Sequence, residues 1–233
     1  LTRASAAVLA LFCGTAVSVH AADIAWDANG GTGGEFLTPV NWVGDAVPGS
    51  SDVARINSNT SLASPVTLSS GVATVANVNL GASTASYMNL NGGTLIATGV
   101  GTVDFSIGTN AGPTQQALFT LSSGTLQFGT PGSYTDSNDF DIGKNGNGRY
   151  IQTGGLMANH ADDVKVCDSG AGVGVADITG GQMYVADGFS VSDNAGGTGT
   201  LNIGGSAVVV SGNSAGLGGV GGSIAGGYIS VSN

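Results

Sequence analysis

The stretch from residue 140 to residue 157, FDIGKNGNGRYIQTGGLM, holds every part of a unit that recurs along this chain. It begins with an apolar-polar-apolar triplet, Phe140-Asp141-Ile142, which is the pattern of a half-buried strand. An Asn- and Gly-rich corner follows, and then a second alternating triplet, Tyr150-Ile151-Gln152. The pair Gly154-Gly155 and a third apolar segment led by Met157 complete the unit. This pattern predicts three short strands separated by two corners.

The first triplet of the unit occurs five times in the chain. Its last apolar position falls at residues 80, 107, 142, 166 and 191, so neighbouring units are 24 to 35 residues apart. Periods in this range are typical of solenoids, propellers and other repeat folds. Three positions later stands a corner residue with a small polar side chain. Since equivalent Asn side chains can hydrogen-bond between stacked coils, we expect a structural corner ladder formed by Asn110, Asn145, Ser169 and Asn194.

The repeat favours an all-β fold of the parallel β-helix (β-solenoid) class, with short strands and Gly/Asn corners. A coil of three strands closes once per unit and stacks on the next, so parallel strands pair between coils. A propeller blade needs four antiparallel strands in about 40 to 50 residues, which is more than these units supply. An antiparallel sandwich gives no reason for one residue type at the same corner of every unit. We expect strands over more than half of residues 60–233, and almost no helix there.

Charged residues and one cysteine offer a test of this alignment. Asp141 and Lys165 occupy equivalent positions of consecutive units, and so do Lys144 and Asp168. If the coils stack in register, each pair brings opposite charges together, although exposed pairs contribute only about 0 to 1 kcal/mol. Cys167 falls in a column that elsewhere holds Gly or Ser. We therefore expect it to be a small buried residue and not a nucleophile.

Residues 1–21 have the layout of a secretory signal peptide. Arg3 precedes an apolar stretch from residue 6 to residue 19, and Val19-His20-Ala21 provides small residues for cleavage after Ala21. A single membrane anchor is the alternative, but the apolar run is shorter than the ~20 residues that a spanning helix needs. We expect an exported protein, extracellular or at the cell surface, with no membrane insertion of the mature segment. Its repeats, residues 60–233, are expected to continue beyond this sequence.

Residues 22–59 are expected to form an N-terminal cap. They contain both tryptophans of the chain, Trp26 and Trp42, together with Phe36. Bulky aromatic side chains suit a cap that covers the open end of a repeat fold and prevents edge-to-edge growth. Aromatic rings also stack on sugars, so a glycan platform is the alternative interpretation.

The cap also carries a family resemblance. The run Trp26-Asp27-Ala28-Asn29-Gly30-Gly31, then Asn41-Trp42 and Val47-Pro48-Gly49, then Asp52, Ala54 and Ile56, resembles the opening of secreted bacterial β-solenoid repeat proteins of the PEP-CTERM kind. Such proteins are similar to the passenger regions of autotransporters. The resemblance implies an exported surface or matrix protein, and it supplies no catalytic residues.

Composition and charge exclude several classes of function. Only 9% of the residues are charged, and the net charge is −10 with a pI near 4.1, so nucleic acid is not an expected partner. His160 is the one histidine outside the signal segment, which disfavours Ser-His-Asp chemistry and zinc. The Asp-rich run 136–141 offers oxygen ligands for Ca²⁺, but Phe140 interrupts the EF-hand spacing and no Glu closes the loop. We expect no catalytic residue, metal or cofactor.

Two functions stay open at this point. Small side chains in stacked coils favour a non-catalytic structural or adhesive protein, with extracellular polysaccharide or other surface proteins as partners. The alternative is a carbohydrate-active β-helix enzyme, a polysaccharide lyase or hydrolase, because such enzymes use carboxylates, Ca²⁺ and basic residues. A glycan or Ca²⁺ site would then involve Asp141, Asp162, Asp163 and Lys165.

Overall fold

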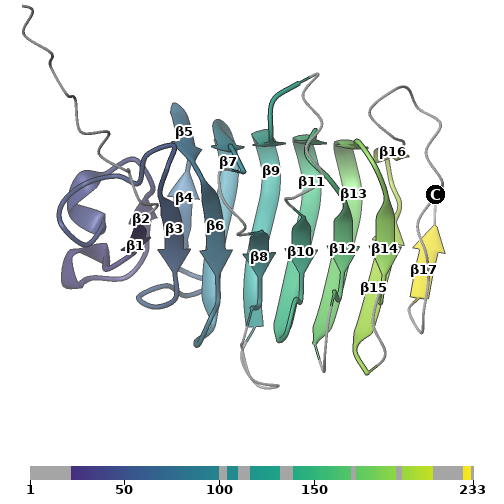
Figure 1. The fold of residues 1–233 in the computed structure, drawn as a ribbon, viewed down its shortest axis with the longest axis horizontal. Helices are drawn as coiled ribbons and strands as arrows, with labels where there is room; N and C mark the ends of the chain where they lie inside the picture. Colours follow the sequence, from purple (N-terminus) through teal and green to yellow (C-terminus); the bar gives the residue numbers. More distant parts are fainter. Residues whose placement is uncertain are drawn as a thin grey trace, which may run out of the picture.

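The computed structural model describes residues 22–99, 104–109, 116–131, 139–168, 172–192, 196–211 and 228–231. Of these residues, 57% lie in strands and 4% in helices. The strands form two sheets, and every pairing between described strands is parallel (Figure 1). The prediction of an all-β fold built from parallel strands is confirmed.

The first sheet has seven short strands, in the order β1 (Asp23–Ala25), β3 (Val53–Ile56), β6 (Asn77–Leu80), β8 (Phe105–Ile107), β10 (Phe140–Ile142), β12 (Val164–Val166) and β14 (Phe189–Val191). The predicted register is confirmed, because the aligned apolar positions pair in succession as Leu80, Ile107, Ile142, Val166 and Val191. Ile56 pairs with Leu80, so the sheet extends into the segment predicted as a cap.

The second sheet contains the longer strands. Along its length lie β2 (Gly34–Glu35), β4 (Val66–Leu68), β7 (Ser86–Ala97), β9 (Gln116–Phe128), β11 (Asn147–Asn159), β13 (Val173–Val185), β15 (Thr198–Ile203) and β17 (Tyr228–Val231). Two further strands pair at its side, β5 (Val72–Val75) with β7 and β16 (Val208–Ser211) with β13. The helices are single 3₁₀ turns, η1 (Ala28–Gly30) and η2 (Pro39–Asn41).

The expected second and third strands of a unit are one continuous strand in β7, β9, β11 and β13. In β7 and β11 the pairing shifts register at the predicted Gly-containing corner, so the corner is a bulge within the strand. Gly124 and Gly155 have positive φ angles of 85° and 70°. A Cβ atom at Gly124 would lie 2.2 Å from the carbonyl oxygen of Gly93, so only glycine lets neighbouring backbones bend together here.

The core lies between the two sheets and is narrow. The ring centroid of Phe105 in β8 lies 5.8 Å from that of Phe119 and 5.1 Å from that of Phe128, both in β9. Inward side chains alternate with outward ones along each long strand, as the period-2 pattern predicts. In β16, Val209 pairs with Met183, while the neighbouring Val208 is 48% exposed.

A column of left-handed residues follows the strands of the first sheet. Its members have φ angles between 57° and 78° and donate their backbone N–H groups to the preceding unit: Gly81, Gly108, Gly143, Cys167 and Ser192. The Cys167 N–H, for example, donates to the carbonyl oxygen of Ile142 at 2.7 Å. Cys167 is buried, with 1% of its surface exposed, as expected for a structural residue.

Some predictions fall outside the described residues. These are the signal segment 1–21 and three of the four ladder positions, Asn110, Ser169 and Asn194. Asn145 is described, and it lies exposed in the corner between β10 and β11. Among the described residues, no helix has the length and apolar character needed to cross a membrane.

Candidate functional site

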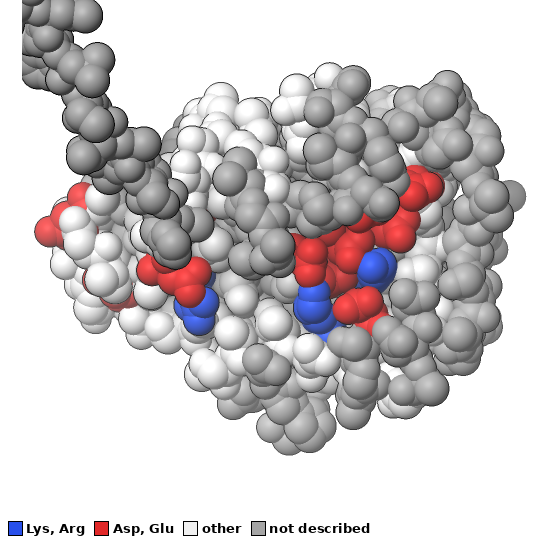
Figure 2. Space-filling view, viewed as in Figure 1, with Lys and Arg blue, Asp and Glu red and all other residues white. Residues whose placement is uncertain are grey.

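Charged side chains gather on one part of the first sheet. The acidic cluster, as we call it, lies on or beside β8, β10 and β12 (Figure 2) and consists of Asp104, Asp139, Asp141, Lys144, Asp162, Asp163, Lys165 and Asp168. It contains all four residues that the sequence suggested for a glycan or Ca²⁺ site: Asp141, Asp162, Asp163 and Lys165. Six carboxyl groups face only two ammonium groups there, so the cluster is strongly anionic when all are ionised.

Part of the cluster is a column of aspartates. Asp104, Asp139 and Asp163 each stand directly before a strand of the first sheet, so in-register pairing brings them into line. The Asp139 N–H donates to Asp104 Oδ1 at 3.4 Å, and the Gly188 N–H donates to Asp163 Oδ1 at 2.6 Å. Asp104 and Asp163 therefore each accept a hydrogen bond from the backbone of the next unit.

Asp104 was not singled out from the sequence. Its signal is its place before Phe105, which matches the place of Asp139 before Phe140 in the next unit. Aligning the residue before each strand, as well as the strand itself, would have found it.

The two lysines of the cluster form ion pairs. Lys144 bridges Asp104 and Asp141, and its Nζ lies 2.8 Å from Asp141 Oδ2. Lys165 Nζ lies 2.5 Å from Asp139 Oδ2 and 3.9 Å from Asp168 Oδ1.

The expected approach of the Asp141 and Lys165 charges is confirmed, because the charge of Asp141 contributes to raising the pKa of Lys165, but the two side chains do not form the closest ion pair. Their backbones do pair in register, as predicted. The long side chain of Lys165 reaches the carboxylate two residues before Asp141, while Lys144, three residues after Asp141, occupies its Oδ2.

Burial controls the ionisation of this site. The side chain of Asp141 is completely buried, and this burial raises its pKa to about 7 in spite of the neighbouring Lys144 charge. Burial also raises the pKa of Asp139, against the opposing effect of Lys165. Burial alone would lower the pKa of Lys144, but the charge of Asp141 and the hydrogen bonds to Asp104 and Asp141 raise it above its usual value. Lys144 is thus held as an ammonium ion.

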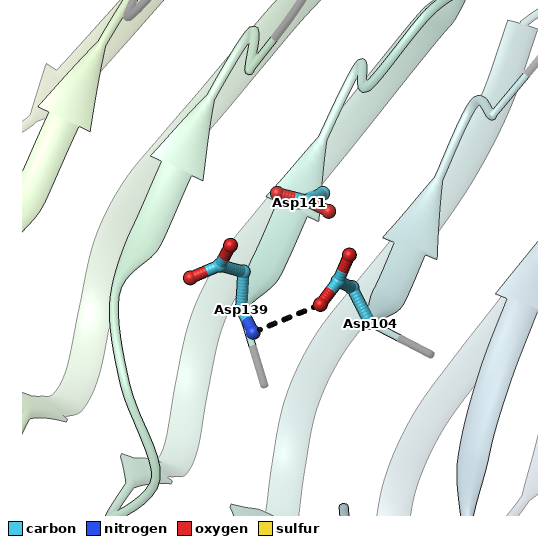
Figure 3. Close-up of side chains that lie close together, drawn as sticks. All are labelled: Asp104, Asp139 and Asp141. Carbon is cyan, nitrogen blue, oxygen red and sulfur yellow. Dashed lines mark hydrogen bonds between the residues drawn. The ribbon is translucent and has the colours of Figure 1, made fainter. Parts of the chain in front are cut away.

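Two groups of carboxylates have the spacing of a metal site. Ligand oxygens of Asp104, Asp139 and Asp141 lie within 4.8 Å of one another, and Figure 3 shows these three side chains close together at β8 and β10. Asp139 forms a second group with Asp162 and Asp163. Asp141, predicted beside Asp162 and Asp163, belongs to the first group instead. Asp139 Oδ1 and Asp141 Oδ1 are buried and have no hydrogen-bond partner.

The three predicted cap aromatics form a buried cluster at the N-terminal end. The Trp42 ring centroid lies 5.0 Å from that of Trp26 and 4.8 Å from that of Phe36, in edge-on contacts. Trp42 Nε1–H donates to the carbonyl oxygen of Phe36 at 2.7 Å. At most 2% of each residue is exposed, so these rings cover the core and do not present a face to a glycan.

Burial shifts the pKa of Cys167 and of His160, the remaining candidates for a nucleophile and a base. Burial raises the pKa of the Cys167 thiol, whose Sγ donates to the carbonyl oxygen of Gly172 at 3.2 Å. Burial lowers the pKa of His160, which is half-buried. The raised pKa keeps Cys167 protonated, so this residue is not an activated thiolate.

No family model, curated protein or solved structure matches this chain.

Proposed function

We propose that this chain is a parallel β-helix, or β-solenoid, which forms a structural or adhesive part of an exported cell-surface or extracellular-matrix protein and has no catalytic activity. The observation that carries the proposal is the parallel pairing of successive strands along both sheets. A scaffold of this kind gains length by adding units, since each unit contacts mainly its neighbours.

The order of the strands along the chain supports a coiled path. From β6 to β15 the chain alternates between the sheets, with β6, β8, β10, β12 and β14 in the first sheet and β7, β9, β11, β13 and β15 in the second. Each strand pairs with its equivalent in the next unit. One unit then corresponds to one coil, and side chains such as Phe105 and Phe119 fill its interior.

Export is supported by the layout of residues 1–21 and by the resemblance of the cap segment to secreted β-solenoid proteins. Cys167 is the single cysteine after the expected cleavage site, so stability outside the cell would depend on strand pairing and packing rather than on an internal disulfide. Extracellular polysaccharide and other surface proteins are the proposed partners.

The acidic cluster favours the alternative, a carbohydrate-active enzyme, in one respect. A carboxyl group with a pKa near 7, as at Asp141, is a candidate general acid or base. However, the Asp141 side chain is completely buried and cannot reach the glycosidic bond of a polymer. Lys165, the candidate proton acceptor, is held by Asp139. These contacts support a structural role for both residues.

An assay on polysaccharides separates the two functions. The purified protein is incubated with soluble and insoluble acidic and neutral polysaccharides, with and without Ca²⁺. Reducing ends and co-sedimented protein are then measured in the same samples. We expect co-sedimentation with at least one insoluble polymer or cell-wall fraction and no release of reducing ends. Release that disappears in Asp162→Ala or Lys165→Ala, but not in the control Asp177→Ala on the second sheet, would replace our proposal with the enzyme.

A further inference from the structure

We infer that Asp104, Asp139 and Asp141 form a site for one Ca²⁺ ion on the first sheet. This site goes beyond the structural or adhesive function and does not depend on it, because it follows from the local arrangement of carboxylates alone.

The spacing of the three carboxylates fits a single ion. Their ligand oxygens lie within 4.8 Å of one another. Ca²⁺ binds oxygen at 2.3–2.6 Å, so two of its ligands can lie at most about 5 Å apart. The carboxyl groups come from β10 and from the residues before β8 and β10, and Figure 3 shows the three side chains close together. Waters would complete the coordination shell of six to eight oxygens.

A buried oxygen without a partner points to a missing ligand. Asp141 is completely buried, and although Lys144 binds its Oδ2, its Oδ1 accepts no hydrogen bond. Asp139 Oδ1 is in the same state, whereas the Oδ1 atoms of Asp104 and Asp163 in the same column accept backbone N–H groups. Buried carboxylate oxygens are normally satisfied, and a cation held by these carboxylates would supply the missing partner.

The charge balance favours a cation at this group of residues. The acidic cluster has four more carboxyl groups than ammonium groups. Lys144 lies between Asp104 and Asp141, so its ammonium competes directly with a metal ion for the same oxygens. About a quarter of the Lys144 side chain is exposed (24%), which leaves it a path toward solvent when the ion binds. This competition predicts weak binding, in the range of about 10⁻⁴ to 10⁻³ M that is typical of extracellular Ca²⁺ modules.

Isothermal titration of the whole protein with CaCl₂, after chelator treatment, tests the site. We expect one ion per chain. Asp104→Asn and Asp139→Asn should each weaken binding about tenfold or more, because each removes a ligand charge. Lys144→Gln should strengthen binding by about tenfold, because it removes the competing ammonium. Asp162→Asn and the second-sheet control Asp177→Asn should change the affinity less than about twofold.

Several results would overturn the inference. One is the absence of saturable Ca²⁺ binding up to about 10 mM. Another is an affinity that Lys144→Gln leaves unchanged, a result that loss of folding cannot mimic because the expected effect is a gain. Loss of binding in Asp162→Asn but not in Asp104→Asn would place the ion at the second carboxylate group instead. Circular dichroism of each variant verifies the fold, and tighter binding of Mg²⁺ than of Ca²⁺ would refute the identity of the ion.

Discussion

Replacement of Gly174 by Ala should weaken the contact between two neighbouring units. Gly174 lies in β13, directly against the left-handed corner at Cys167. A Cβ atom at Gly174 would lie 2.2 Å from the carbonyl oxygen of Ile142 and 2.5 Å from the backbone nitrogen of Cys167. These are the two atoms of the hydrogen bond that joins the corner to the preceding unit. The added methyl group therefore cannot be accommodated without movement of the backbone.

The size of the effect follows from this geometry. Losing the net contribution of one backbone hydrogen bond costs about 1 kcal/mol, and overpacking a rigid site costs about 1 to 3 kcal/mol. The lower chain entropy of Ala in the unfolded state offsets about 0.4 to 1 kcal/mol of that. We expect Gly174→Ala to lower the free energy of unfolding by about 1 to 3.5 kcal/mol.

Urea unfolding followed by circular dichroism measures this change, with Gly49→Ala as the matched control. A Cβ atom at Gly49 would meet only Asp52 Oδ2, at 3.5 Å, which is an ordinary contact. The control should lose no stability and should gain about 0.4 to 1 kcal/mol from the lower chain entropy of Ala in the unfolded state. If Gly174→Ala is as stable as the control, the units do not stack in the register described above.

Three other outcomes are expected. Because burial raises the pKa of Asp141 from 3.8 to about 7, the native state binds this proton more tightly than the unfolded state does. The protonated Asp141 carboxyl therefore stabilises the native state fully below about pH 4, and this stabilisation is lost as the pH rises through about 7. In EDTA, Asp141→Asn should flatten the decline of the urea midpoint over that pH range. Iodoacetamide should modify Cys167 far faster in urea than in native buffer, since the thiol is buried; equal rates in peptide mass spectrometry would contradict this. Mass spectrometry of the exported protein should find Ala22 at its N-terminus, and a membrane-bound form that keeps residues 1–21 would refute the signal peptide.

The sequence predicted the strand register because the register is a local property. Apolar alternation and a small residue after each triplet identify the pairing of Leu80 with Ile107 without knowledge of the rest of the chain. The triplet Ala54-Arg55-Ile56 has the same pattern and lies 24 residues before Leu80, so its spacing already indicated a strand of the first sheet and not only a cap segment. The continuity of β11 across Gly154-Gly155, in contrast, could not be predicted. Whether such a pair ends a strand or bends it depends on the backbone of the neighbouring unit.

The site was predicted less completely than the fold. Asp141, Asp162, Asp163 and Lys165 do lie in one cluster, because in-register strands bring equivalent positions together. The direct ion pair of Lys165 is with Asp139 and not with Asp141, since a flexible lysine side chain reaches any carboxylate within several ångströms. The complete burial of Asp141 controls its pKa and depends on packing around β10. The alternating pattern of the strand marks Asp141 only as a polar position, so its burial could not be predicted from the sequence.

The units differ in length although their strands pair in one register, and this difference affects how the chain would extend under force. Hydrogen bonds between neighbouring units connect consecutive segments of the chain, so tension on its two ends would detach one unit at a time. A unit of 24 residues, such as the one from Ile142 to Val166, would release about 80 Å of extended chain. The unit of 35 residues from Ile107 to Ile142 would release about 120 Å. A force-extension trace would therefore show steps of unequal length at similar force, and the long step would mark the position of the 35-residue unit.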